Sequence, residues 1–137
     1  TVVHVVTLLE DLPVQETLDA VADVTAADLR PGAVIRNRVR PSRLATRSMN
    51  AAAAGRVDEA RIRTGLAEAG LDLKPDVIDG LVAETVAHAT RAQVQAAALR
   101  RLEDAGLPSV ELPELTGGVD LGGLYELVES LTAQGVR

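Results

Sequence analysis

Polar residues follow three short apolar segments of this sequence, where their side chains could meet a ligand. They are Glu10 with Asp11, Asn37 with Arg38, and the loop over residues 113–120. An amide such as Asn37 can offer both a donor and an acceptor to the edge of a planar heterocycle. The adjacent Gly117 and Gly118 let backbone approach a flat ring closely. These features indicate a heterocycle-binding site; the alternatives are an Asn37 bonded to neighbouring backbone and a simple glycine turn.

The other polar candidates favour structural roles. The carboxylates of Glu10, Asp11 and Glu16 could pair with a cation or a ligand, but complementing the positive end of a helix is the favoured interpretation. We expect His4 to be a satisfied core or edge histidine in a strand, and His88 to lie partly exposed on a helix. Neither a phosphate loop of the GxxxxGK[ST] type nor an HExxH or GxSxG motif occurs in the sequence. We therefore predict no catalytic residue and no metal ligand within this chain.

The composition is that of a globular protein. Of the 137 residues, 47% are hydrophobic and 25% are charged, while Cys is absent and Tyr125 is the sole aromatic residue. The lack of Cys excludes disulfides and thiolate zinc sites. No run of 18 apolar residues occurs, and no secretory signal pattern is present. We expect a cytoplasmic protein.

The charges are segregated along the chain. The net charge is −6, yet residues 29–57 contain seven arginines and no acidic residue, which leaves −13 on the rest. The seven are Arg30, Arg36, Arg38, Arg40, Arg43, Arg47 and Arg56. This window predicts an anionic ligand or an acidic partner, with a solvated loop as the alternative. Binding of free nucleic acid is disfavoured, because the overall charge is negative and stacking aromatics are missing.

Hydrophobic patterning predicts a parallel β-α-β unit at the start of the chain. Residues 2–9 are almost continuously apolar, as in a parallel strand that is buried on both faces. A helix is expected from Pro13 to about Val24, with Asp11 as a candidate cap, followed by a strand over residues 33–39. Such a first strand requires neighbours that the sequence itself does not supply.

The remainder is predicted to be mainly helical. Helices are expected over residues 58–69 and 76–105, then a strand over 109–112 and a helix over 121–134. The last helix should point four apolar residues inward: Leu124, Leu127, Val128 and Leu131. The predicted fold is a three-layer α/β structure, in one incomplete domain. Its expected parts are a strand-helix-strand unit (1–39), a helical insert (40–106), and a last strand, loop and helix (107–137).

Three segments, in order, resemble one family. The first reads VTLLEDLPVQET from Val6 to Thr17, and the second reads VIRNR from Val34 to Arg38. The third comprises Leu112-Pro113 followed by GVDL from Gly118 to Leu121. This ordered set is similar to the C-terminal half of the anion-transporting ATPases, which include the arsenical-pump ATPase and the ATPases that target tail-anchored membrane proteins. The PVQETLDA and GVDLGGLYEL segments resemble the actinobacterial members most.

The resemblance implies a fold and a ligand. It implies the C-terminal part of a P-loop-type parallel sheet with a helical insert, in which Asn37 reads the adenine edge and the loop after the last strand packs on the ring. The implied nucleotide-binding residues are Asn37, Arg38, Pro113, Glu114, Leu115, Thr116, Gly117 and Gly118. Glu114 departs from the family pattern, because relatives often place this acid later in the loop.

The resemblance also implies what the chain needs from elsewhere. The phosphate loop and the magnesium-binding residues belong to the N-terminal half of the family, so ATP with magnesium is expected in the intact parent and not tightly on this chain alone. The implied partners are that half, a second copy or a paralogue, and a membrane-protein client, without nucleic acid. The sequence begins at Thr1 with no initiator Met, which predicts a piece of a longer protein. The alternative function is a non-catalytic module that pairs with a complete ATPase.

Overall fold

The computed structural model describes residues 1–42 and 44–136, which form two compact units. Among these residues, one unit contains 1–41 and 94–136, and the other contains 42 and 44–93. The long helix α4 (Pro75–Asp104) contributes residues to both.

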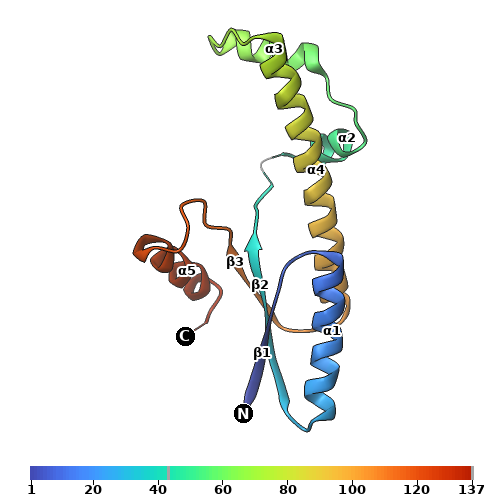
Figure 1. The fold of residues 1–137 in the computed structure, drawn as a ribbon, viewed down its shortest axis with the longest axis vertical. Coiled ribbons are helices and arrows are strands. Elements are labelled where there is room, and N and C mark those ends of the chain that lie inside the picture. Colours follow the sequence, from blue (N-terminus) through green and yellow to red (C-terminus); the bar gives the residue numbers. More distant parts are fainter. Residues whose placement is uncertain (43, 137) are drawn as a thin grey trace. The chain divides into compact units, whose positions relative to one another are not determined.

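The first unit is a parallel sheet with helices on both sides. Its elements, besides the end of α4, are β1 (Val2–Thr7), α1 (Asp11–Ala26), β2 (Arg30–Val39), β3 (Ser109–Pro113) and α5 (Leu121–Ala133). The strand order is β1-β2-β3, and both strand pairs are parallel. Helix α1 and the end of α4 lie on one side of the sheet, and α5 lies on the other (Figure 1). This arrangement confirms the predicted α/β class with three layers.

The core of this unit lies between the sheet and the two helices on its first side. Val14 of α1, Val34 of β2 and Leu102 of α4 are almost completely buried, together with Leu9 and Ala98. Val14 and Leu18 are four positions apart, so both fall on the inner face of α1. Helix α1 begins at Asp11, whose side chain does not cap it; the flanking residue is Glu10, which makes no side-chain cap bond either. The prediction of an Asp11 cap is therefore wrong.

Strand β1 is an edge strand and is not buried on both faces. Thr7 is buried and Val3 and Val5 are half-buried, whereas Val2 is 38% and Val6 59% exposed. Alternate side chains of a strand point to opposite faces of the sheet, so α1 covers one face of β1 and the second face is open. Strand β1 is apolar at nearly every position, but the described residues bury only the side chains on one of its faces.

The His4 side chain bonds to the backbone of β2 at the point where the register between β1 and β2 shifts. The register shifts between Val3 and Val5, so that His4 lies opposite the segment containing Gly32 and Ala33. The Nδ1 atom of His4 accepts a 3.1 Å hydrogen bond from the backbone N–H of Ala33. A Cβ atom on Gly32 would lie 2.7 Å from His4 Cε1. His4 is thus a satisfied edge histidine, as predicted.

The opposite edge of the sheet, along β3, is partly closed by the residue that ends α5. Gln134 Oε1 accepts a 2.7 Å hydrogen bond from the Glu111 N–H, and Gln134 Nε2 donates one of 2.7 Å to the Glu111 carbonyl. The side-chain amide therefore occupies the positions that a further strand would use. Two residues on, Pro113 has no N–H to offer.

Helix α5 covers less of the sheet than its pattern predicts. Leu127 and Leu131 are half-buried, but Leu124 is 49% and Val128 57% exposed. The prediction that all four point inward is correct for Leu127 and Leu131 and wrong for Leu124 and Val128. Helix α5 packs against β3, an edge strand, and this contact leaves Leu124 and Val128 exposed.

The second unit is helical. It contains α2 (Thr46–Ala53), α3 (Glu59–Glu68) and the first part of α4. Asp58 caps α3 by accepting a 3.0 Å hydrogen bond from the Arg61 N–H. Helix α2 was not predicted, because its eight residues are too few to show a clear apolar period. Ile78 and Ala89 are buried here, and His88 is partly exposed, as expected.

Candidate functional site

The three polar segments singled out in the sequence all follow the carboxyl ends of the strands, and therefore lie at the same end of the parallel sheet. Strands β1, β2 and β3 are parallel and end at Thr7, Val39 and Pro113. In open α/β sheets, ligands bind beyond these carboxyl ends. The segments that follow the strands therefore form the candidate site of the first unit.

The end of β2 is bent at Asn37 and Arg38. Register with β3 shifts between Arg36 and Val39, and Arg38 has a φ of 56°, in the left-handed region that few non-glycine residues adopt. The Oδ1 atom of Asn37 accepts a 3.0 Å hydrogen bond from the Arg38 N–H. Because only the carbonyl oxygen of the amide can accept, this bond sets its orientation and leaves the Nδ2 group without a partner among residues 1–42 and 44–136.

A carboxylate-arginine cluster joins the end of β2 to the loop after β3. The Glu114 carboxylate accepts hydrogen bonds of 3.0 Å from Arg38 Nη2 and 2.8 Å from Arg40 Nη2, and Arg40 Nε also donates to it. The Glu114 N–H donates a 3.1 Å bond to the Val39 carbonyl. We call Arg38, Arg40 and Glu114 the loop clasp.

The loop clasp has a defined charge state at neutral pH. The hydrogen bond from Arg40 lowers the pKa of Glu114 below its ordinary value of 4.5, against the opposing effect of burial, and Arg38 lowers it further. The Glu114 side chain is 19% exposed, while the two arginines are 63% and 50% exposed. Glu114 is therefore ionised at pH 7, and the clasp carries one net positive charge.

Beyond Glu114, the loop turns towards α5. Leu115 is half-buried and its Cδ1 atom would lie 2.8 Å from a Cβ atom built on Gly123, whereas Thr116, Gly117 and Gly118 are exposed. Gly118 has a φ of 83°, which requires glycine for an unstrained turn. Asp120 then caps α5 by accepting a 2.8 Å hydrogen bond from the Gly123 N–H. Both ends of the loop are thus held, while its middle stays accessible.

A hollow of about 400 Å³ lies beside Asn37. It is bounded by Val5–Leu8, by Pro13, Glu16, Thr17 and Ala20 of α1, and by Asn37. The Thr7 and Thr17 hydroxyls donate their protons to the Leu8 and Pro13 carbonyls, at 3.1 and 2.8 Å. The charged acceptor on the hollow is the Glu16 carboxylate, and the side-chain donor without a partner among the described residues is the Asn37 Nδ2 group. One of these groups accepts and the other donates.

The eight predicted nucleotide-binding residues therefore separate into three groups, of which the third, Pro113 with Leu115, Thr116, Gly117 and Gly118, belongs neither to the hollow nor to the loop clasp. Asn37 lines the hollow, and Arg38 and Glu114 form the loop clasp next to it. None of the loop residues 113–118 lines the hollow. Sequence reasoning missed the pairing of Arg38 and Arg40 with Glu114. The available signal was that residues 29–57 contain arginines but no acidic residue, so any carboxylate that pairs with them comes from a distant segment.

The arginine window is divided between several structural roles. Arg36 forms an ion pair with Glu111 on the neighbouring strand, with 3.4 Å between Nη1 and Oε2. Arg38 and Arg40 belong to the loop clasp. From the sequence we expect this window to contact an anionic ligand or an acidic partner; Arg43, one of its seven arginines, lies outside the described residues. Arg47 and Arg56 belong to the second unit.

A further arginine anchors the start of α1. Arg101 of α4 donates to the Asp11 carboxylate and carbonyl, and its Nη2 atom donates a 2.6 Å hydrogen bond to Gln15 Oε1. Asp11 is thus engaged with a cation of the same chain. Across the described part of the chain, no group of three or more His, Cys, Asp or Glu side chains could hold a metal ion.

Comparison with known proteins finds relatives along the whole chain. The sequence is 47% identical over 137 residues to ATPase BagA of Mycobacterium tuberculosis and, to the same extent, to a protein of Mycobacterium bovis that is also named as an ATPase. The chain is similar to ATPases. All of its own length is aligned, but it spans only 40% of the length of these relatives. No family model matches the sequence.

No helix within the described residues is both long enough and apolar enough to cross a bilayer. Helix α4 has the length, with 30 residues, but charged side chains recur along it.

Proposed function

We propose that this chain is the adenine-binding part of an ATPase of the anion-transporting type, the family that its motifs resemble. The observation that carries the proposal is the 47% identity to proteins named as ATPases, which extends over every residue of the chain. The whole protein would hydrolyse ATP, and this chain would contribute recognition of the base.

The hollow beside Asn37 suits the edge of a purine. Its volume of about 400 Å³ is within the range of small-molecule pockets. With Oδ1 held by the Arg38 N–H, the free Nδ2 group of Asn37 would donate to a ring nitrogen. The Glu16 carboxylate on the same hollow would accept from an exocyclic amino group. Adenine offers that combination of an amino donor and a ring-nitrogen acceptor.

The loop clasp would position the second wall of the site. Glu114 ties the loop of residues 113–118, which does not itself line the hollow, to the residues that follow Asn37. The loop backbone would therefore have to approach the face of a bound ring from outside the hollow, while Asn37 contacts the edge of the ring. Bound ATP with magnesium would supply the phosphoryl group for hydrolysis. In the family that the sequence resembles, the residues that hold the phosphates and magnesium belong to the N-terminal half.

The proposal includes protein partners. The open face of β1 would pack against that N-terminal half. The exposed apolar residues of α5, which include Leu121 at 69% and Tyr125 at 64% exposure, would contact a second copy, a paralogue or a membrane-protein client. An acidic chain without stacking aromatics is not expected to bind nucleic acid.

Calorimetry on the full-length protein tests the proposal. ADP should bind at least about tenfold more tightly than GDP, because guanine presents a carbonyl where adenine presents its amino group. Equal affinities would contradict adenine recognition. Absence of any nucleotide binding, together with a stable complex with a separate ATPase, would instead support the non-catalytic module.

A further inference from the structure

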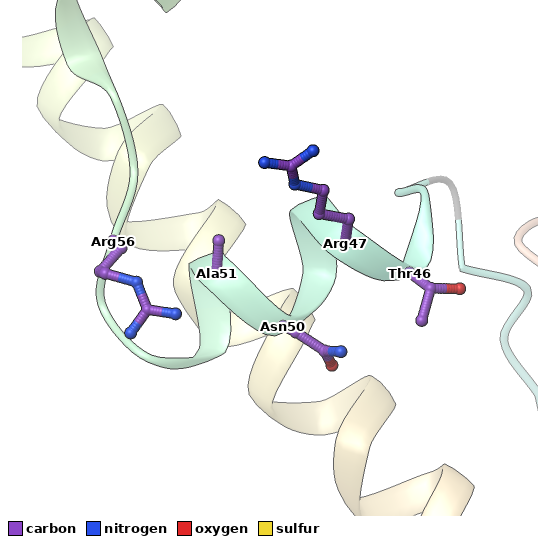
Figure 2. Close-up of a pocket in the computed structure, with 5 residues that line it drawn as sticks. All are labelled: Thr46, Arg47, Asn50, Ala51 and Arg56. Atoms are coloured by element: carbon purple, nitrogen blue, oxygen red, sulfur yellow. The ribbon is translucent and has the colours of Figure 1, made fainter.

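Two arginines of the second unit have no role in the site described above. Arg47 and Arg56 border an open hollow of about 670 Å³, whose other lining residues are Thr46, Asn50 and Ala51. Figure 2 shows Ala51 between the two arginines, with Asn50 next to it towards Arg47 and Thr46 beyond Arg47. All five residues belong to one compact unit.

The local sequence explains why both arginines border this hollow. Arg47 and Ala51 are four residues apart on α2, so they lie on the same helix face. Gly55, with a φ of 70°, ends the helix; its N–H donates to the Ala52 carbonyl, and the Arg56 N–H donates to the Ala51 carbonyl at 2.8 Å. This turn brings the backbone of Arg56 next to that of Ala51. The small Ala51 side chain leaves the space between the arginines open.

The polar groups around the hollow are almost entirely donors. Neither Arg47 nor Arg56 has an ion pair or a side-chain hydrogen bond with any described residue, in contrast to Arg36, Arg38 and Arg40. The Asn50 Oδ1 atom accepts a 3.3 Å hydrogen bond from Gln93, so the amide group of Asn50 that has no partner among the described residues is its Nδ2 donor. No lining residue is acidic, and the nearest carboxylate in sequence, Asp58, is committed to the cap of α3.

We infer that this hollow, which we call the α2 hollow, binds a small phosphate-bearing molecule that is free in solution. Two guanidinium groups, an amide and a hydroxyl match a ligand with several charged oxygens, because arginine binds phosphate through multiple hydrogen bonds. A volume of about 670 Å³ exceeds the need of a single phosphate and suits a phosphorylated metabolite. The site is independent of the proposed nucleotide site, since it shares no residue with the hollow beside Asn37.

Inorganic pyrophosphate is a suitable probe. Its binding to the full-length protein would be measured by calorimetry at low salt and with saturating ADP present, so that phosphate binding at a nucleotide site does not contribute. The double variant Arg47→Gln/Arg56→Gln should weaken pyrophosphate binding by about tenfold or more. The matched control is Arg30→Gln/Arg61→Gln, which removes the same charge from two exposed arginines outside the hollow and should retain wild-type affinity.

A neutral variant separates the shape of the hollow from its charge. Ala51→Leu places a larger side chain between the arginines and should also weaken pyrophosphate binding, with thermal unfolding confirming that the fold is kept. Equal affinity in wild type and both double variants would overturn the inference. So would equal weakening by the two double variants, because that result assigns binding to diffuse charge. Binding to vesicles of anionic lipid without binding of pyrophosphate would likewise contradict a soluble ligand.

Discussion

The Glu114 carboxylate accepts a 3.0 Å hydrogen bond from Arg38, although the two residues are 76 positions apart in the sequence. Arg38 follows the amide that is proposed to read the base, and Glu114 opens the loop that is proposed to cover it. One ion pair therefore couples the two walls of the proposed site. A change in either partner should alter base recognition without touching the base itself.

Replacing Asn37 by Asp isolates the donor role of its amide. Aspartate can still accept the hydrogen bond from the Arg38 N–H, but it has no Nδ2 group to donate to a ring nitrogen. ADP affinity, measured by calorimetry on the full-length protein, should fall by the equivalent of about 1–3 kcal/mol, as it should for Asn37→Ala. Gln93→Glu makes the same chemical change on an exposed helix and should have no effect. Unchanged affinity in Asn37→Asp would reject the assignment.

Removing the charge of Glu114 should produce a pH-dependent loss of stability. The pKa of Glu114 is lowered in the folded state, so its ionised form stabilises the fold above the ordinary pKa of 4.5, and this contribution disappears as the pH falls through the lower folded value. Urea unfolding at a series of pH values between 7 and 3 should therefore show wild type and Glu114→Gln differing at neutral pH and converging in acid. A difference that is independent of pH would contradict a charged clasp.

Gly32→Ala should destabilise the sheet by about 1–3 kcal/mol, because the new Cβ atom would overlap the ring of His4. That atom would lie 2.7 Å from His4 Cε1, whereas nothing lies within 4 Å of a Cβ atom at Gly80 in α4. Gly80→Ala should stabilise by about 0.5–1 kcal/mol through helix propensity. Chemical denaturation measures both. If His4 causes the overlap, Gly32→Ala should cost less in a His4→Ala background.

The isolated 137-residue chain should self-associate through β1. This strand leaves an apolar face and an unpaired edge exposed, and Val6 is 59% exposed on it. Sedimentation of the purified chain should show association that Val6→Lys abolishes, since an edge lysine opposes strand pairing. Val119→Lys, at a position that is 75% exposed in the loop before α5, should leave association intact. A compact monomer would contradict the expectation and favour an autonomous module.

The sequence predicts this fold where a local pattern carries the information. The apolar runs of β1 and β2 and the long helix α4 follow from periodicity, and Asp58 and Gly70 mark the limits of α3. Periodicity could not show that Leu124 and Val128 are exposed, because it does not tell how wide a surface the partner of a helix covers. It could not show the role of Asp11 either, whose partner Arg101 lies on a distant segment.

The candidate site was predictable to a smaller extent. The position of Asn37 at a strand end follows from the sequence, and the resemblance to a family supplied its expected ligand. The orientation of its amide depends on the left-handed backbone at Arg38, which is uncommon for a non-glycine residue and has no signature in the residue types. The contact of Glu114 with two arginines likewise depends on the register between β2 and β3.

The side-chain amide of Gln134 makes the two edges of the sheet unequal in their ability to pair with another strand. Because this side chain bonds both backbone groups of Glu111 and Pro113 offers no N–H, addition of a strand alongside β3 is opposed and addition alongside β1 is favoured. Two chains that pair through their β1 edges would then expose only their obstructed β3 edges. Polymerisation into fibrils requires strand addition at both edges of each subunit, and Gln134 opposes it at one of them. Gln134→Ala would reopen that edge, which converts a self-limiting association into one that can propagate.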